Sequence, residues 1–177
     1  MRRHALACAL IALGGAATPA AAQATNLADR IGHPLAVENP NGGNGEYVTL
    51  LATPAPESFQ ALQVVYSTLK IPVTSLDPDH GVIGTTNWTV PHWLAGHQLS
   101  RYFDCGSGRG QSADEMSVKL TIHSTISNDT AATRSLLTTT LDVTAASQIE
   151  MAHPMPCQTT GELETRISDE VVKLLKK

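Results

Sequence analysis

The chain has 177 residues, with 12 Lys and Arg against 16 Asp and Glu, so its formal net charge is −4 at pH 7. This length suits a single domain with its own hydrophobic core. Because nucleic-acid binding rests on neutralising phosphates, a mildly acidic chain argues against that class of partner.

Residues 1–22 have the pattern of a cleavable export signal. Residues 1–4 are basic, residues 5–17 are apolar, and small residues follow as far as Ala24. This order, ending in an A-x-A site, is typical of secretory signals, and cleavage after Ala22 or Ala24 fits equally well. The apolar run is shorter than the about 20 residues that span a bilayer. We therefore predict a periplasmic or secreted mature protein without a membrane span.

Cys8 lies inside this signal. The residues before it loosely resemble a bacterial lipobox, but only three apolar residues precede the cysteine. We therefore expect Cys8 to be removed with the signal. Removal also takes away Arg2 and Arg3 and leaves 10 basic residues against 16 acidic ones.

Cys105 and Cys157 are the two cysteines of the mature chain. An isolated pair in an oxidising compartment is typical of a disulfide. The chain-entropy gain for closing a loop of about 52 residues is about 4 kcal/mol. We predict a Cys105–Cys157 bridge.

The first part of the mature chain predicts a linker and then a strand. Gly, Asn and Pro dominate residues 38–45, so residues 23–45 are expected to be a flexible linker. Residues 46–52 (EYVTLLA) are rich in apolar and aromatic side chains and predict a strand. The folded domain is expected to cover residues 46–177.

A helix and a hairpin follow. Pro56 suits the first turn of a helix over residues 56–69, and the apolar stripe of that helix consists of Phe59, Leu62, Val65, Tyr66 and Leu69. Residues 73–90 predict a hairpin, because the sequence DPDHG at residues 77–81 strongly favours a turn.

Residues 91–114 predict a long connection that contains several glycines. Loops of this length in a compact domain are usually functional or disordered.

Residues 116–126 and 134–145 alternate between apolar and polar side chains and predict a second hairpin with one buried face.

The C-terminal part predicts a connection over residues 146–158 and a closing helix over residues 161–175. Thr159 and Glu162 have the spacing of a capping box at its start.

The predicted order of elements along the chain is thus β-α-β-β-β-β-α. Each helix has one apolar stripe and the clearest strands have one apolar face, which favours an α+β fold with an antiparallel sheet and both helices on one face, in two layers.

This order, together with the sequences QALQVVYSTL (60–69), IPV (71–73) and DPDHGVIG (77–84), resembles the helix-grip domains of BamC, the lipoprotein of the outer-membrane β-barrel assembly machinery. The resemblance implies a helix-grip topology over roughly residues 46–175. The sequence LSRYFDCG at residues 99–106, with a second cysteine before the last helix, is also similar to small exported bacterial proteins, and this likeness implies no activity.

Histidines of the mature chain raise the question of a metal site. They are His33, His80, His92, His97, His123 and His153. His92, His97 and Cys105 are residue types that bind zinc, but their spacing matches no closed zinc motif, and H-E-x-x-H does not occur. We expect no metal ligand and no cofactor. A metal-binding protein that uses His92 and His97 is the alternative.

No catalytic motif is found in the sequence. G-x-S-x-G does not occur, and Gly106-Ser107-Gly108 lacks both a strand-to-helix turn and a base. The glycines at 106, 108 and 110 also lack the spacing of a dinucleotide loop. We therefore expect a protein that is not an enzyme.

Four of the seven aromatic residues in the chain after residue 22 lie between residues 88 and 103: Trp88, Trp93, Tyr102 and Phe103. Trp and Tyr are enriched in recognition surfaces, and Arg101 lies beside them in sequence. The alternative is that these rings fill one end of the core. We predict a binding or structural module in which a loop over residues 91–110, anchored by the disulfide, presents an aromatic surface to an envelope protein.

Overall fold

The computed structural model describes residues 31–37, 45–106, 112–130, 132–147 and 153–177. The predicted signal peptide over residues 1–22, including Cys8, lies outside this description, as does most of the predicted linker. Within that linker, Leu35–Val37 forms strand β1, which pairs with β2 (Glu46–Leu51). A part of residues 23–45 therefore belongs to the sheet.

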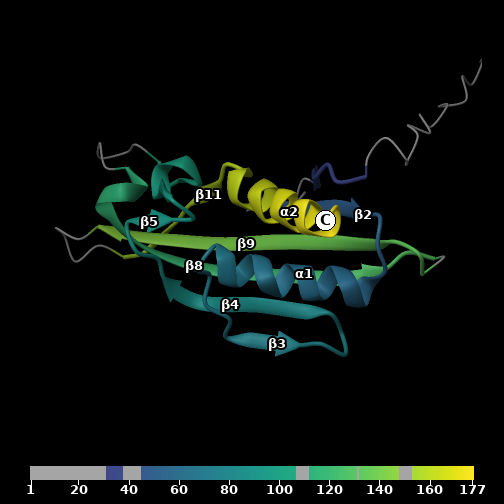
Figure 1. The fold of residues 1–177 in the computed structure, drawn as a ribbon. Helices are drawn as coiled ribbons and strands as arrows, with labels where there is room; N and C mark the ends of the chain where they lie inside the picture. The colour runs from purple at the N-terminus through teal and green to yellow at the C-terminus, as the bar shows by residue number, and fades with distance from the viewer. Residues whose placement is uncertain (1–30, 38–44, 107–111, 131, 148–152) are drawn as a thin grey trace, which may run out of the picture.

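A mostly antiparallel sheet forms the frame of the fold (Figure 1). Its order is β1-β2-β9-β8-β4-β3. In addition, β10 pairs with Thr144 and Ala145, toward the C-terminal end of β9. The remaining strands are β3 Ser75–Asp77, β4 Val82–Thr89, β8 Met116–Asn128, β9 Ser135–Ser147 and β10 Met155–Pro156.

The β8–β9 hairpin is the centre of this sheet. Its ladder runs unbroken over the 13 residues of each strand. Buried and exposed side chains alternate along β8, as the sequence pattern predicted. Strand β8 continues two residues beyond its predicted end, up to the connection with β9, and β9 continues two residues beyond its predicted end at residue 145. Within the connection, Arg134 Nε donates to Asp129 Oδ2 at 2.8 Å.

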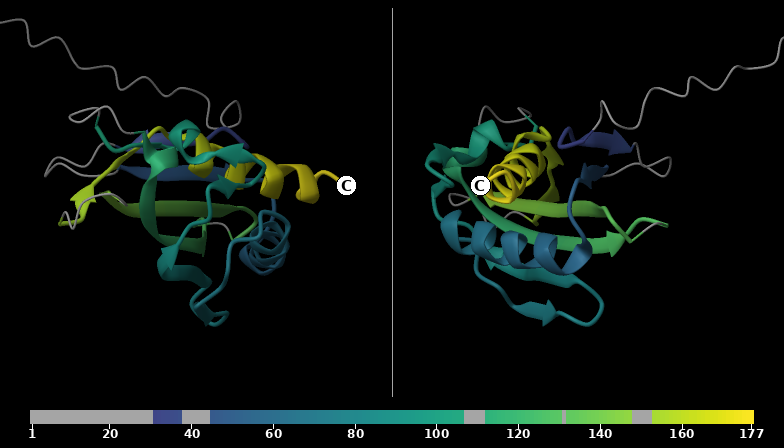
Figure 2. Two further views of the ribbon diagram at one scale, coloured as in Figure 1. Left: turned by 90° about the vertical axis from the view of Figure 1, so that its left-hand side faces the viewer. Right: turned by 45° about the vertical axis from the view of Figure 1, so that its right-hand side comes forward.

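Helices α1 (Ala55–Thr68) and α2 (Glu162–Leu175) contact each other, and both also contact β9. Figures 1 and 2 show them on the same side of the sheet. The predicted α+β class is confirmed. The core between helices and sheet consists of the apolar stripes of the helices and the inward residues of β4, β8 and β9.

Hydroxyl groups inside this core link the helices to the sheet. Three pairs join a helix to a strand: Thr49–Ser168 at 2.9 Å, Tyr66–Ser124 at 2.9 Å and Ser135–Ser58 at 2.7 Å. A fourth, Ser124–Thr139 at 3.1 Å, joins β8 to β9 beside them. A buried hydroxyl without a hydrogen-bond partner lowers the stability of the fold. These bonds therefore favour one defined placement of each helix on the sheet.

Short elements occupy much of the segment predicted as a long connection over residues 91–114. They are strands β5 Trp93–Leu94, β6 His97–Gln98 and β7 Phe103–Asp104, and 3-10 turns over Leu99–Arg101 and Ala113–Glu115. β5 and β6 pair with each other, and β7 pairs with β11 (Gln158–Thr159).

The predicted disulfide between Cys105 and Cys157 is confirmed, with the two Cα atoms 4.1 Å apart. It lies where β7 ends and β11 begins. The Cys157 amide also donates to the Val143 carbonyl of β9 at 2.9 Å. The bridge therefore fixes the segment that carries β5, β6 and β7 to the end of the main sheet.

The predicted capping box at the start of α2 is wrong. Gly161 is the N-cap residue, with a φ of 84°. Thr159 Oγ1 instead accepts from the Gly161 amide at 2.9 Å and donates to Glu164 Oε1 at 2.6 Å. A Cβ atom on Gly161 would collide with the Tyr47 hydroxyl, so the chain requires glycine here for both its conformation and its space.

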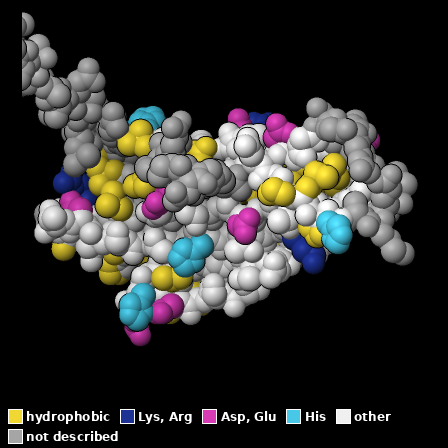
Figure 3. All heavy atoms as spheres, turned by 180° about the vertical axis from the view of Figure 1, so that it is seen from behind, with side chains coloured by type: hydrophobic (Ala, Val, Ile, Leu, Met, Phe, Trp, Pro, Cys, Tyr) yellow, Lys and Arg dark blue, Asp and Glu magenta, His cyan; other side chains and the backbone are white. Residues whose placement is uncertain are grey.

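Figure 3 shows the other face of the molecule, where separate histidine and acidic side chains lie among polar ones and small groups of hydrophobic ones. Lys119 and His123, which point away from the helices on β8, are both exposed. Within the described part of the chain, no helix has the length and apolar character needed to cross a membrane.

Candidate functional site

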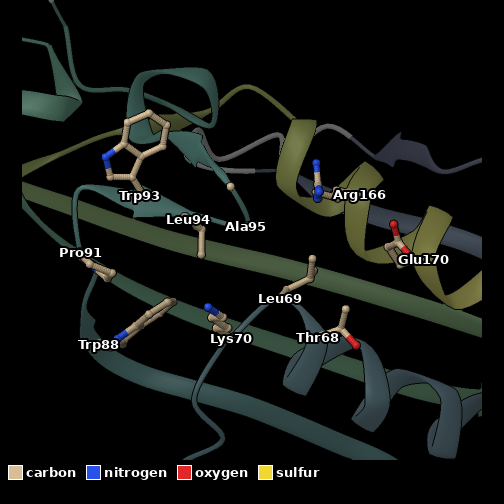
Figure 4. Close-up of a pocket in the computed structure, with 11 residues that line it drawn as sticks. Thr68, Leu69, Lys70, Trp88, Pro91, Trp93, Leu94, Ala95, Arg166 and Glu170 are labelled. Carbon is tan, nitrogen blue, oxygen red and sulfur yellow. The ribbon is translucent and has the colours of Figure 1, made fainter.

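A pocket of about 370 Å³ lies between the end of α1, helix α2 and the β5–β6 hairpin (Figure 4). We call it the tryptophan pocket. Its lining consists of residues 68–70, Trp88, Pro91, residues 93–96, Arg166 and Glu170. Figure 4 shows the two indoles on one side of the pocket and the two charged side chains of α2 on the other.

Trp88 reaches the pocket through a bulge in β4. Thr85 lies opposite Ile122 of β8, and Trp88 lies opposite Leu120, so one extra residue of β4 is inserted between these pairs. Asn87, in the bulge, has a φ of 50°. β-bulges redirect side chains in this way, and asparagine tolerates the left-handed conformation better than most residues.

Lys70 enters the pocket from a Schellman motif at the end of α1. The Lys70 amide donates to the Ser67 carbonyl at 3.1 Å, and the Ile71 amide donates to the Tyr66 carbonyl at 2.9 Å. The position of Lys70 in this motif is usually glycine, because its φ is positive; here it is 58°. A lysine at this position lowers the free energy of unfolding relative to glycine. It also brings a positively charged side chain to the pocket.

The β5–β6 hairpin presents Trp93. Leu94 pairs with His97, which leaves Ala95 and Gly96 as a two-residue loop with φ angles of 48° and 84°. Positive φ at both positions is typical of type I′ hairpin loops. Trp93 is 61% exposed, whereas Leu94 points into the core.

Backbone strain is concentrated around this pocket. Four described residues other than glycine have a positive φ, namely Lys70, Asn87, Ala95 and Ala132. Lys70 and Ala95 line the pocket, and Asn87 precedes Trp88. Residues in sparsely populated conformations cluster at functional sites, which makes the tryptophan pocket the candidate site of this chain.

Two cations of the pocket have no acidic partner in the described part of the chain. Three arginines are described there: Arg101 is 3.2 Å from Glu162, Arg134 is 2.8 Å from Asp129, and Arg166 has no ion pair. Lys70 has none among these residues either. The pocket therefore carries unbalanced positive charge.

Arg166 also separates the tryptophan pocket from a second hollow of about 250 Å³. That hollow is lined by Arg101, Tyr102, Glu162 and further residues of α2. Burial raises the pKa of Tyr102, against the positive charges of Arg166 and Arg101. Arg166 Nε and the Tyr102 hydroxyl are both buried, and the two side chains face each other, since a contact with Arg166 also opposes the rise in the pKa of Tyr102.

The five residues predicted to form one aromatic surface are divided by the fold. Trp88 and Trp93 share the tryptophan pocket, and Arg101 lies in the second hollow, paired with Glu162. Tyr102 and Phe103 are buried and belong to the core, because the 3-10 turn and β7 turn them inward. Their rings therefore do not contribute exposed area to a binding surface.

Lys70, Arg166 and Glu170 were not predicted as site residues. The sequence gives no direct signal for Arg166 and Glu170, which occupy ordinary helical positions on α2. Lys70 has one indirect signal: it follows the last apolar residue of α1 and precedes Ile71-Pro72, so it stands at the left-handed position of a helix end.

The histidines considered as metal ligands have other contacts. His92 Nδ1 lies 3.2 Å from the Asp114 carbonyl oxygen, and the His97 ring meets Tyr102 edge-on with centroids 6.3 Å apart. Cys105 is in the disulfide. Among the residues that the structure describes, no group of three or more His, Cys, Asp or Glu side chains could hold a metal ion.

The chain matches no known protein-family model and no curated protein sequence. The resemblance to the helix-grip domains of BamC therefore stays a prediction.

Proposed function

We propose that this protein is an exported, non-enzymatic binding module of the cell envelope that holds a partner protein at the tryptophan pocket. The observation that carries the proposal is the composition of the pocket: both tryptophans of the chain line it, together with two cations that lack acidic partners in the described part. Trp and Arg are the residue types that dominate protein–protein binding energy.

The exposure of Trp93 supports this proposal. Its side chain leaves a large apolar area in contact with water, while Pro91 and Leu94 beside it line the same pocket. Covering apolar area contributes about 25 cal/mol per Å². A partner side chain placed over Trp93 would gain this free energy without first displacing a core residue.

The covalent anchoring of the segment also supports the proposal. Beyond the disulfide, the Thr160 hydroxyl donates to the Arg101 carbonyl at 2.8 Å, and the Thr160 amide donates to the Tyr102 carbonyl at 2.9 Å. These bonds attach the segment after β6 to the start of α2. A binding surface that is already ordered loses less conformational entropy when a partner binds.

The experiment that tests this function is site-specific photo-crosslinking in the intact cell envelope. A photoreactive side chain at Thr68, on the rim of the pocket, should yield a defined crosslinked protein, whereas the same group at Leu76, on the edge strand β3, should not. Adding Trp93→Ala should abolish the crosslink from Thr68. A crosslink from Thr68 that survives Trp93→Ala would contradict the proposal.

A further inference from the structure

The charge of the tryptophan pocket differs from that of the whole chain. Acids outnumber bases by 16 to 12 in the sequence, yet the pocket contains Lys70 and Arg166 without an acidic partner in the described part. Glu170 also lines the pocket and offsets part of this charge, although its Oε2 lies 3.3 Å from the ammonium of Lys173, so the lining keeps two cations against one anion. The two free cations therefore favour a ligand with a negative group.

The rest of the pocket favours an apolar group beside that charge. Trp88, Pro91, Trp93 and Leu94 provide its apolar wall, and Leu69 adds to it at the end of α1. A volume of about 370 Å³ suits a few side chains of a partner. The ligand must therefore combine one anion with a neighbouring aromatic or large aliphatic group.

The pocket has few groups for recognising a ligand rich in hydroxyls. The Thr68 hydroxyl already donates to the Val64 carbonyl at 2.8 Å, and Glu170 is paired with Lys173. Apart from the indole N–H groups, the two cations are the side-chain donors that remain. This favours a carboxylate on an apolar peptide over a sugar acid. A polyanion such as nucleic acid would meet an acidic chain.

We propose that the tryptophan pocket binds a peptide segment of a partner protein in which an acidic side chain stands next to an aromatic or large aliphatic one. The carboxylate pairs with Arg166, Lys70 adds positive charge to the same pocket, and the apolar side chain packs on Trp93. Guanidinium–carboxylate pairs are strong because two parallel N–H groups can donate to one carboxylate. This inference rests on the proposed function and names the chemistry of the partner.

Tryptophan fluorescence provides the test, because both tryptophans of the chain line the pocket. The probes are three synthetic peptides: N-acetyl-Ala-Phe-Asp-Ala-amide, the same peptide with Asn for Asp, and the same peptide with Ala for Phe. We expect the first peptide to change the emission saturably at low salt. Each of the other two should bind about tenfold more weakly, since a charged hydrogen bond or a buried aromatic contact contributes about that factor. Added salt should weaken the first peptide most.

Variants then locate the contacts. Arg166→Gln and Lys70→Gln should each weaken the Asp peptide about tenfold while leaving the Asn peptide unchanged. Lys119→Gln, on the opposite face of the sheet, is the matched control and should change neither. Equal binding of the Asp and Asn peptides would overturn the inference, and so would saturation by glucuronic acid but not by the Asp peptide.

This result can be separated from a failure of the proposed function. If the crosslink from Thr68 depends on Trp93 but no peptide alters the fluorescence, the pocket binds a partner of different chemistry and the inference alone is wrong. If neither the crosslink nor the peptides depend on the pocket, both proposals fail.

Discussion

Trp88 lies opposite Leu120 in the β4–β8 ladder, and Thr85 lies opposite Ile122. Two residues of β4 separate Trp88 from Thr85, whereas one residue of β8 separates Leu120 from Ile122. Leu120 and Ile122 point to the same face of the sheet, because they are two residues apart on β8. In a regular strand Trp88 would therefore point to the opposite face from Thr85. The bulge turns its indole to the helix side, where it lines the tryptophan pocket.

The first prediction concerns Asn87 in this bulge. Asn87→Val should lower the free energy of unfolding by about 1–2 kcal/mol, because a β-branched residue resists a positive φ. Asn87→Gly is the control and should keep wild-type stability within about 0.5 kcal/mol. Chemical denaturation measures both. Equal stability of the Val and Gly variants would show that the left-handed conformation of Asn87 does not hold in solution.

Lys70 gives a second prediction, which separates stability from binding. Lys70→Gly should raise the free energy of unfolding by about 1 kcal/mol, because glycine adopts the positive φ without strain. Lys70→Gln keeps the strain and removes the charge, so its stability should stay close to wild type. Both variants should weaken partner binding. If Lys70→Gly is less stable than the wild type, the assignment of a strained Schellman position is wrong.

The sequence predicted those elements whose pattern lies within one short stretch of the chain, and it missed most features that depend on residues far apart in sequence. The alternation along residues 116–126 and the apolar stripe from Phe59 to Leu69 are local patterns, and both predicted their elements correctly. The bulge at Asn87 left no such pattern, because one inserted residue looks like ordinary polar sequence. The pocket was only half predicted: Trp88 and Trp93 are conspicuous, whereas Arg166 joins them through tertiary packing of α2.

The disulfide gives a third prediction. Reduction of Cys105–Cys157 should lower the free energy of unfolding by up to about 4 kcal/mol, as expected for freeing a loop of this length. Denaturation curves with and without a phosphine reductant measure this loss. A Cys105→Ala/Cys157→Ala variant should resemble the reduced protein and should not respond to the reductant. A reductant effect that persists in this variant would point to another cause.

Tyr66 gives a fourth prediction, on alkaline stability. Burial raises the pKa of Tyr66 to about 12, while a hydrogen bond with Ser124 opposes the shift. Because the folded pKa lies above the ordinary value of 10.0, its contribution to stability is complete below pH 10 and is lost as the pH rises through about 12. A difference of about two pKa units corresponds to about 3 kcal/mol.

The control for this effect is Tyr66→Phe, which removes the ionising group and leaves the Ser124–Thr139 bond in place. The free energy of unfolding should fall less steeply between pH 10 and 12 in this variant than in the wild type. Parallel curves for the two proteins would show that Tyr66 ionises equally well in the folded and unfolded states.

The most direct test of the central claim is the dissociation constant of the partner identified by crosslinking from Thr68. Trp93→Ala and Arg166→Gln should each raise it at least about tenfold, since such residues contribute about 2 kcal/mol or more when they anchor an interface. Leu76→Ala and Lys119→Gln, which remove a similar apolar and a similar charged side chain elsewhere on the surface, should leave it within about twofold. Equal dissociation constants for all four variants would contradict the assignment of the tryptophan pocket as the binding site.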